Sequence, residues 1–286
     1  MVAGNTGFTS DTSKTRERIE KLDAYFRATV LDGDGKFICQ HEYACKKSFS
    51  DPHPLGHFYD GQLHHVGNDY DLFKNNRPLR VVVVGMSYGH GPARISIAKR
   101  SEYMGDMGRH YSARGSGEIP RRTPHMSGTT FALRAAFGLG FADTSRAAEF
   151  IQVGEEKVHI FDAFALLDFL LCSAISEDKK TKDLSTHAMS VNCAPHFRRA
   201  LEILEPNLLI GQGQRTAEWM ARAGFGHEST YQNPVKIVVN GSACQLLSFS
   251  HPSARFPLNW GINAKGKYLL EVVRPAIEKA VGDLIG

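Results

Sequence analysis

A histidine and a glycine-rich loop are the first candidates for chemistry in this chain. His251 follows the apolar segment 245–249 and precedes Pro252, which restricts the backbone beside it. A histidine can donate a proton near neutral pH, or a hydrogen bond to a developing negative charge. The loop 85–91 contains three glycines, which let a backbone turn sharply and approach a ligand closely. We expect His251 and this loop to face one cleft.

The loop follows four consecutive valines, Val81–Val84. Such a run has no polar face, which is typical of a strand buried on both sides in the middle of a parallel sheet. Ligands of open α/β sheets bind outside the carboxyl ends of the strands. The loop is therefore predicted to form an active-site wall, with an ordinary strand-to-helix turn as the alternative.

Strand and helix patterns alternate along the rest of the chain. Further strands are predicted at 158–172, 206–211, 235–239 and 245–249, and helices at 11–31, 128–137, 143–152, 193–204, 216–222 and 265–285. An ordered excursion is expected at 36–78 and a long polar loop at 101–127. This alternation predicts one α/β domain over 11–286, with a central, mainly parallel sheet and helices on both faces, after a disordered tail at 1–10.

Composition narrows the class of protein. The chain has 286 residues, a formal net charge of +4 and five cysteines. Its apolar runs are too short to span a bilayer and its start shows no signal pattern, so we expect a cytoplasmic protein with no membrane partner. Disulfides are not expected in a reducing cytosol, so four of the five cysteines could form a metal site and one could be spare. The mild positive charge permits DNA binding.

Four segments occur in the order used by the uracil-DNA glycosylase superfamily, and the chain resembles a divergent member of it. They are Val81–Val84 with Gly85-Met86-Ser87-Tyr88-Gly89, the apolar run ending at Asp168 and Cys172, the run from Cys193 through Pro206 to Gly213, and His251-Pro252-Ser253-Ala254-Arg255. The resemblance covers roughly residues 36–262 and is closest to the single-strand-selective and iron–sulfur-bearing branches. It implies a monofunctional DNA glycosylase of base excision repair, which flips out uracil or a related deaminated base and hydrolyses its glycosidic bond.

The resemblance assigns the catalytic residues. His251 is expected to stabilise the negative charge on O2 of the departing uracil. The first loop of the family often supplies a carboxylate or an amide that positions the attacking water, whereas this chain has Ser87 there. A serine orients water by hydrogen bonding but does not take its proton. His90 is expected to help position the water or a phosphate.

The base-binding residues implied by the resemblance are Gly85, Met86, Tyr88, Tyr111 and Asp168. Tyr111 is expected to stack on the flipped base, with Tyr88 as its competitor. Asp168 lies where the family usually has an asparagine that reads the uracil edge. An ionised aspartate only accepts hydrogen bonds, so it would repel O4 of uracil and suit a base with an exocyclic amine. A buried, protonated Asp168 would still donate, which leaves the preferred base open.

The loop after His251 is expected to contact DNA through Ser253, Arg255, Phe256 and Leu258. In the family this loop enters the minor groove, and an apolar side chain fills the space vacated by the base. Phe256 or Leu258 is the expected wedge, and their packing as a surface pair on the closing helix is the alternative. The expected partner is damaged double- or single-stranded DNA, bound by a monomer.

The resemblance also implies a 4Fe–4S cluster. Cys39, Cys45, Cys172 and Cys193 fall where iron–sulfur-bearing members have their ligands, although Cys39 and Cys45 are spaced more widely than the usual pair. A zinc site that includes His41 is a weaker alternative. The four cysteines are otherwise unliganded core residues, as Cys244 is expected to be.

Two other functions fit parts of the sequence. The missing carboxylate favours a catalytically weak or covalently trapping DNA-binding protein on the same fold. The histidines between His41 and His65 would instead suit a metal-dependent hydrolase.

Overall fold

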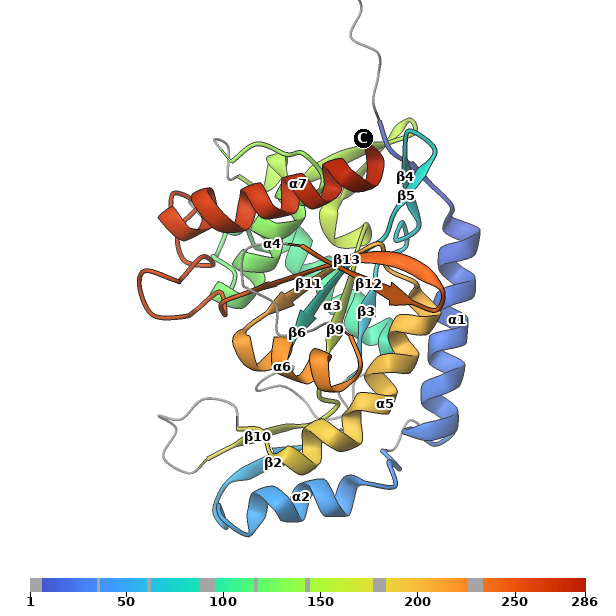
Figure 1. Cartoon of the computed structure of the whole chain (residues 1–286), viewed down its shortest axis with the longest axis vertical. Coiled ribbons are helices and arrows are strands. Elements are labelled where there is room, and N and C mark those ends of the chain that lie inside the picture. The colour runs from blue at the N-terminus through green and yellow to red at the C-terminus, as the bar shows by residue number, and fades with distance from the viewer. Residues whose placement is uncertain are drawn as a thin grey trace, which may run out of the picture.

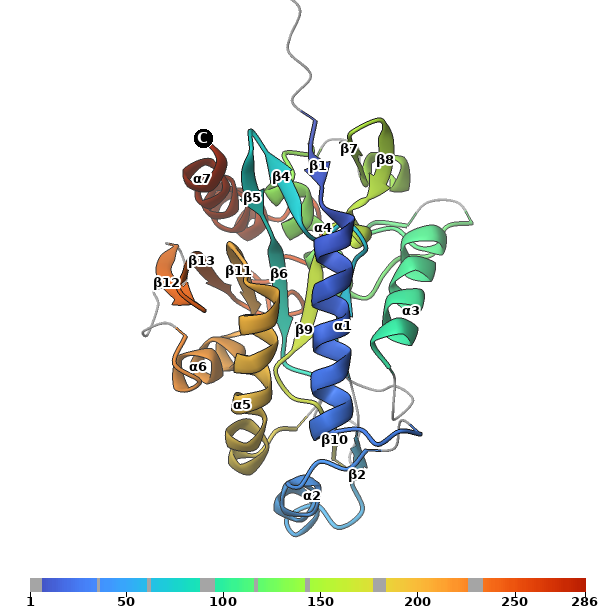
Figure 2. The same cartoon turned by 90° about the vertical axis from the view of Figure 1, so that its right-hand side faces the viewer.

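The computed structural model describes residues 7–34, 37–60, 63–87, 96–115, 118–141, 145–176, 184–225 and 234–286. This part of the chain is mixed α/β, with a central six-stranded, mainly parallel sheet. Helices cover both faces of the sheet (Figures 1 and 2). The predicted α/β class and mainly parallel sheet are thereby confirmed. No helix in the described ranges is long and apolar enough to cross a membrane.

The central sheet brings the ends of four parallel strands to one edge. Its order is β12 (Val235–Val239), β13 (Ser242–Phe249), β11 (Leu208–Gln212), β6 (Val81–Gly85), β9 (Ala165–Asp168) and β3 (His65–Val66). β13, β11, β6 and β9 run parallel, and only the outer strands β12 and β3 are antiparallel to their neighbours. Gly85 pairs with Asp168, so the segments that follow β6 and β9 start side by side.

The valines of β6 point alternately into two separate cores. Val81 and Val83 pack with α4 (Pro124–Ala136) and α7 (Arg274–Ile285), whereas Val82 and Val84 pack with α1 (Thr12–Thr29), α5 (His187–Leu204) and α6 (Gln214–Arg222). Successive side chains of a strand face opposite sides of its sheet. A run of four valines is therefore what a strand covered by helices on both faces requires.

Smaller elements surround this centre. They are β1 (Thr9–Ser10), α2 (Glu42–Ser50), β2 (His57–Tyr59), β4 (Leu72–Lys74), β5 (Arg77–Leu79), β7 (Phe150–Val153), β8 (Glu156–His159), β10 (Ser173–Ile175), and the short turns η1 (Arg146–Ala148), η2 (Ile160–Asp162) and η3 (Leu269–Val273). Residues 7–10, predicted as part of a disordered tail, are instead ordered. Phe8 is buried, its backbone bonds to Gln152, and β1 pairs with β4.

The predicted polar loop at 101–127 was wrong at both ends: residues 101–110 belong to helix α3 (Ile97–His110), and residues 124–127 belong to α4. Ser96 caps α3 by accepting from the backbone of Lys99. One face of the helix is buried, and it carries Ile97, Arg100, Met104 and Met107. The glycines and charged residues between these positions obscured the helical spacing in the sequence. Gly108, which was expected in a loop, is buried in the helix against the ring of His159.

Two other predicted elements differ from the structure. The described part of the helix expected at 143–152 forms η1 and then strand β7, which pairs with β8 and buries Ile151 and Val153. The strand expected at 158–172 is divided into the end of β8, η2 and β9. That segment is apolar almost throughout, so it has no periodicity from which its internal turn could be located.

Candidate functional site

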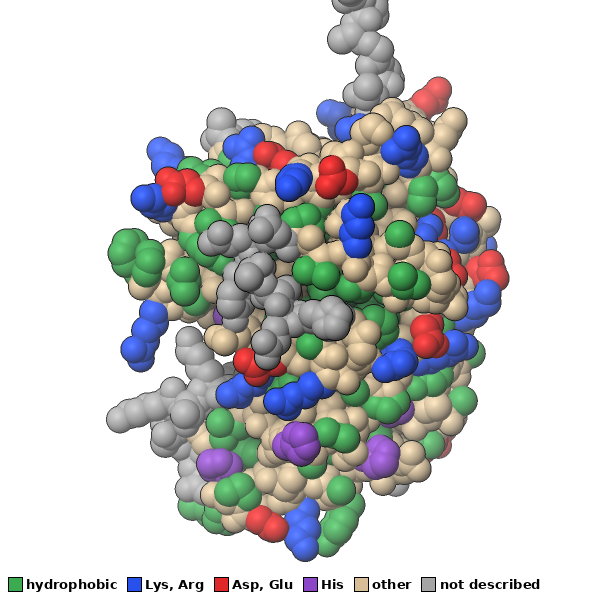
Figure 3. Space-filling model, in the orientation of Figure 1, with side chains coloured by type: hydrophobic (Ala, Val, Ile, Leu, Met, Phe, Trp, Pro, Cys, Tyr) green, Lys and Arg blue, Asp and Glu red, His purple; other side chains and the backbone are tan. Residues whose placement is uncertain are grey.

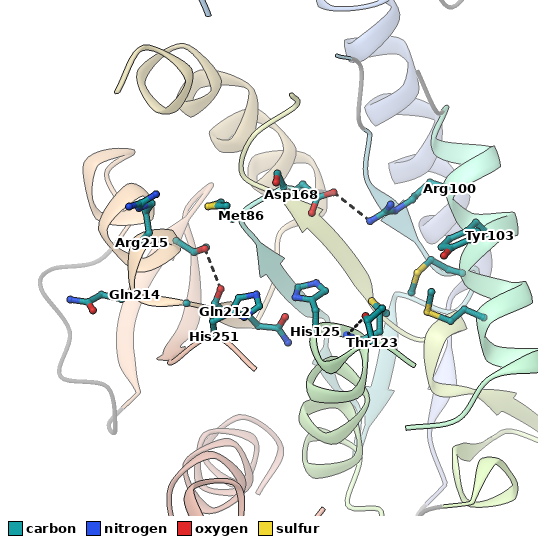
Figure 4. A pocket seen from close by; sticks show the side chains of 16 residues that line it. Met86, Arg100, Tyr103, Thr123, His125, Asp168, Gln212, Gln214, Arg215 and His251 are labelled. Carbon is teal, nitrogen blue, oxygen red and sulfur yellow. Dashed lines mark hydrogen bonds and ion pairs between the residues drawn. The ribbon is translucent and has the colours of Figure 1, made fainter. Parts of the chain in front are cut away.

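A cavity of about 580 Å³ lies at the carboxyl edge of the sheet. Its walls come from the segments after β6, β9, β11 and β13, together with α3, the start of α4 and the start of α6 (Figure 4). The lining residues are Met86, Ser87, Arg100, Tyr103, Met104, Met107, Thr123, His125, Met126, Asp168, Gln212, Gly213, Gln214, Arg215, Thr216 and His251. A pocket of this size suits a small polar ring system.

The cavity brings together four of the predicted site residues: Met86, Ser87, Asp168 and His251. Gly85 lies directly beside them, because a Cβ atom on it would be 3.3 Å from Oδ1 of Asp168 and 3.1 Å from Cε1 of His125. A glycine at position 85 therefore keeps the space between Asp168 and His125 free of a side chain.

Asp168 ends β9 and is 1% exposed. One of its carboxylate oxygens, Oδ2, lies 3.4 Å from the guanidinium of Arg100. Its backbone N–H donates to Nδ1 of His64 at 3.3 Å. Burial lowers the pKa of His64 to about 3, so this histidine is neutral at pH 7 and can accept that bond. The backbone of Asp168 is thus bound to His64, and its carboxylate is paired with a permanent cation.

His251 is oriented by its own loop. The backbone N–H of Ser253 donates to Nδ1 at 3.2 Å, and Oγ of Ser253 lies 2.8 Å from the same atom. A nitrogen that accepts from a backbone N–H carries no proton, so the proton of the neutral ring is on Nε2. The ring therefore offers an N–H donor from Nε2 at the cavity wall.

His125 belongs to this site, although the sequence analysis did not identify it. Its ring stacks on that of His251, and burial lowers its pKa to about 3, with a further lowering by the charges of His251 and Arg100. It occupies the first turn of α4, after the N-cap Thr123 and Pro124. A threonine cap followed by proline predicts a helix start, so that signal was available in the sequence.

Ser87 lines the cavity, but not all of the remaining predicted residues do. Oγ of Ser87 is buried and has no hydrogen-bond partner in the described part of the chain. Tyr111 ends α3 and does not line the cavity, whereas Tyr103 on the same helix does. Tyr88 and His90 lie outside the described residues.

The loop after His251 presents apolar side chains to solvent beside the cavity. Phe256 is 87% exposed and Leu258 47% exposed, so the alternative of a pair packed on the closing helix does not describe them. Arg255 between them and the cavity is exposed as well. Lys and Arg side chains are interspersed with Asp and Glu over the face seen in Figure 3 rather than gathered in one patch.

The cysteines expected to bind a cluster come from segments that meet beside α5: Asn192 of α5 contacts Cys45 of α2, and the backbone of Leu171, next to Cys172, contacts Cys193 of α5. Burial raises the pKa of Cys172 well above its ordinary value, and the charges of Cys193, Cys45 and Cys39 raise it further. Nδ2 of Asn192 donates to Sγ of Cys45 at 3.4 Å, and backbone N–H groups donate to Cys39 and Cys193. Amide donors around sulfur suit thiolate ligands.

A donor set of four thiols has the ligand chemistry of an iron–sulfur cluster. In the part of the chain that the structure describes, no three His, Cys, Asp or Glu side chains are grouped closely enough to hold one metal ion. A four-iron cluster takes one thiolate on each of its irons and so tolerates a wider spacing of sulfurs. The histidines proposed for a metal-dependent hydrolase include His64 and His65, which are buried and neutral in the core.

No protein-family model matches this chain, and no curated protein matches its sequence.

Proposed function

We propose that the protein is a DNA glycosylase that excises uracil or a related deaminated base, on a uracil-DNA glycosylase-like version of the α/β fold. One observation carries the proposal. Met86, Ser87, Asp168 and His251 come from segments far apart in the sequence, and they line one cavity at the carboxyl edge of the sheet. The resemblance of the sequence assigns these same positions to the base and the reacting water.

The residues divide the chemistry between them. The glycosidic C1′–N1 bond breaks with its electron pair going to the base, whose O2 becomes negative. The Nε2–H of His251 donates a hydrogen bond to O2 and stabilises this leaving group. A water held by Oγ of Ser87 then adds to C1′ and loses a proton to solvent. Ser87 suits this role because its hydroxyl is buried without a protein partner among the described residues.

The cavity also offers surfaces for the flipped ring. Tyr103 and His125 line it, so they replace Tyr111 as candidates for stacking on the base. Stacking of a base on an aromatic side chain contributes roughly 1–3 kcal/mol.

The exposed loop gives a physical route to base flipping. Phe256 and Leu258 stand in solvent next to His251, where an apolar side chain can occupy the gap left in the duplex. Arg255 provides a cation for the phosphates on either side. Exposing two such apolar residues has no benefit for folding, which supports a binding role.

Cys39, Cys45, Cys172 and Cys193 would hold a 4Fe–4S cluster in this proposal, with zinc as the weaker alternative. The group would be structural, because the cysteines do not line the cavity that holds His251. It would tie α2 to the turn after β9 and to α5.

Release of free base from oligonucleotides tests the proposal. We expect the purified protein to release uracil, or one of the deaminated purines hypoxanthine and xanthine, and not a normal cytosine. Absence of release from every one of these substrates would refute the enzymatic function.

A DNA-binding or trapping protein is the second candidate. Among the described residues that line the cavity, Asp168 is the sole carboxylate, and it is paired with Arg100. No general base for water is therefore evident in that part of the chain. This candidate predicts DNA binding that weakens steeply with salt, either without free base or with a covalent adduct.

A further inference from the structure

We infer that Arg100 is the residue that determines base specificity, and that it reads the base edge together with Asp168 and His251. This inference rests on the proposed function, since it concerns the base held in that cavity. Asp168 alone would repel a carbonyl oxygen. Arg100 supplies the donor that the aspartate lacks.

The geometry places a guanidinium donor beside the carboxylate acceptor. Oδ2 of Asp168 lies 3.4 Å from the Arg100 guanidinium, and Oδ1 faces Gly85 and His125. The ring of His251 stacks on that of His125. In Figure 4, Asp168 and Arg100 lie side by side, joined by a dashed line, and His125 and His251 lie below them in the view. The cavity wall thus presents a paired guanidinium donor and carboxylate acceptor, and the same cavity is lined by the imidazole N–H donor of His251.

Uracil is the pyrimidine that complements these three groups. Its edge presents O4 as an acceptor, N3–H as a donor and O2 as an acceptor. Arg100 would donate to O4, Asp168 would accept from N3–H, and His251 would donate to O2, next to the bond that breaks. Cytosine presents an amine, an unprotonated N3 and O2 instead. The amine would face the guanidinium and N3 would face the carboxylate, so both contacts would be repulsive.

The helix that carries Arg100 fixes its side chain in the wall. Arg100 is 4% exposed and belongs to the same buried face of α3 as Met104 and Met107. A helical residue on this face cannot turn to solvent without displacing its neighbours. An arginine held in this way is preorganised for a planar ligand, because its guanidinium forms a rigid fork of donors.

A sulfur substitution on the base tests the inference. 4-Thiouracil keeps N3–H and O2 but replaces O4 by a poorer acceptor. We expect the wild-type protein to release uracil about 10- to 100-fold faster than 4-thiouracil, the factor for loss of a hydrogen bond to a charged group. In Arg100→Met this preference should fall to about a few-fold. The double variant Arg100→Met/Asp168→Leu leaves no unpaired charge and no donor to O4, so it should show the same fall. Arg109→Met, an exposed arginine on the same helix, is the matched control and should keep the wild-type ratio.

The outcomes separate this inference from the proposed function. Equal slowing of both bases in the two Arg100 variants, with an unchanged ratio, would overturn the inference and leave the glycosylase standing. If the wild-type protein releases no base, the proposed function fails, and binding of the free bases, measured by NMR, decides the inference. Tighter binding of uracil than of 4-thiouracil by wild type but not by the variants would support it. Equal or undetectable binding of both bases by the wild type would overturn it.

Discussion

The rings of His125 and His251 are stacked, with centroids 5.7 Å apart and an angle of 18° between their planes. His125 is neutral at pH 7, since burial lowers its pKa to about 3. A neutral ring supports the plane of His251 without placing a second positive charge beside it. His125 therefore helps to aim the donor that the proposed reaction requires.

Loss of the His125 ring should impair catalysis. His125→Ala removes the stack on His251 and a surface for the base, so we expect base release to slow about 10-fold or more, as for loss of one aromatic stacking contact. His125→Phe keeps a ring of similar shape and should recover most of the rate. If Phe and Ala slow the reaction equally, the ring does not act by stacking.

His251 should be the most sensitive position. Removing one donor to a developing oxyanion costs about 10²- to 10³-fold in rate, and we expect this loss for His251→Ala in single-turnover assays on uracil-containing DNA. Ser253→Ala removes the hydroxyl contact to Nδ1 and should cause a smaller loss. An unchanged rate in His251→Ala would contradict the assigned role.

Phe256 should matter for duplex substrates above all. Phe256→Ala removes the apolar wedge, so we expect release from duplex DNA to slow about 10-fold, while release from single strands changes little, because unstacking a paired base costs a few kcal/mol. Tyr43→Ala, which removes an exposed ring from α2, is the control. Equal effects on both substrates would argue against insertion into the stack.

Stability should fall as the solution is acidified. Burial lowers the pKa of His64 to about 3 and that of His65 to about 4, from 6.5 in the unfolded chain. Below about pH 6.5 the unfolded state therefore binds protons that the folded state does not, and each histidine costs about 1.4 kcal/mol per pH unit. Burial raises the pKa of Asp162, which acts in the opposite direction at lower pH.

Urea unfolding at about pH 7 and about pH 5 measures this loss. His65→Gln should reduce the pH dependence by one proton, because glutamine does not titrate. His57→Gln alters an exposed histidine and should leave the dependence unchanged. A wild-type protein equally stable at both pH values would show that these histidines are not held neutral.

The cysteines predict a visible absorption band in protein purified without oxygen. Cys172→Ser should lose the band and the bound iron, and it should melt at a lower temperature, because the cluster would join three segments. Cys244→Ser changes a buried cysteine in β13 and should keep the iron. Zinc in place of iron would favour the zinc alternative, and absence of any metal would leave four unliganded thiols.

Elements with a local physical cause could be predicted from the sequence. The valines of β6 have no polar face, so burial on both sides followed directly. Asn240 and Gly241, between the strands predicted at 235–239 and 245–249, both have positive φ, 48° and 78°, which is typical of a tight hairpin turn. The three site residues Ser87, Asp168 and His251 each follow or end a strand, and the carboxyl edge of a sheet is where such residues meet.

The rest depended on contacts distant in sequence. Arg100 lies on a helix whose periodicity is interrupted by glycines, and its burial comes from packing beside the sheet rather than from its neighbours in the chain. His125 reaches the site because the first turn of α4 packs beneath the loop that follows β13. No local pattern distinguishes an arginine or histidine that faces a cavity from one that faces solvent.

Along β6, β9, β11 and β13, the residues that stabilise the fold and the residues proposed for the chemistry occupy different positions. The two cores on either side of the sheet fix where each strand ends, and the polar site residues Ser87, Asp168 and His251, at or beyond those ends, belong to neither core. Mutations can therefore replace these residues one at a time while the scaffold persists. A serine and an aspartate at positions where the superfamily that the sequence resembles uses other side chains would then be variants that the same framework accommodates, and new base preferences could evolve here without a new fold.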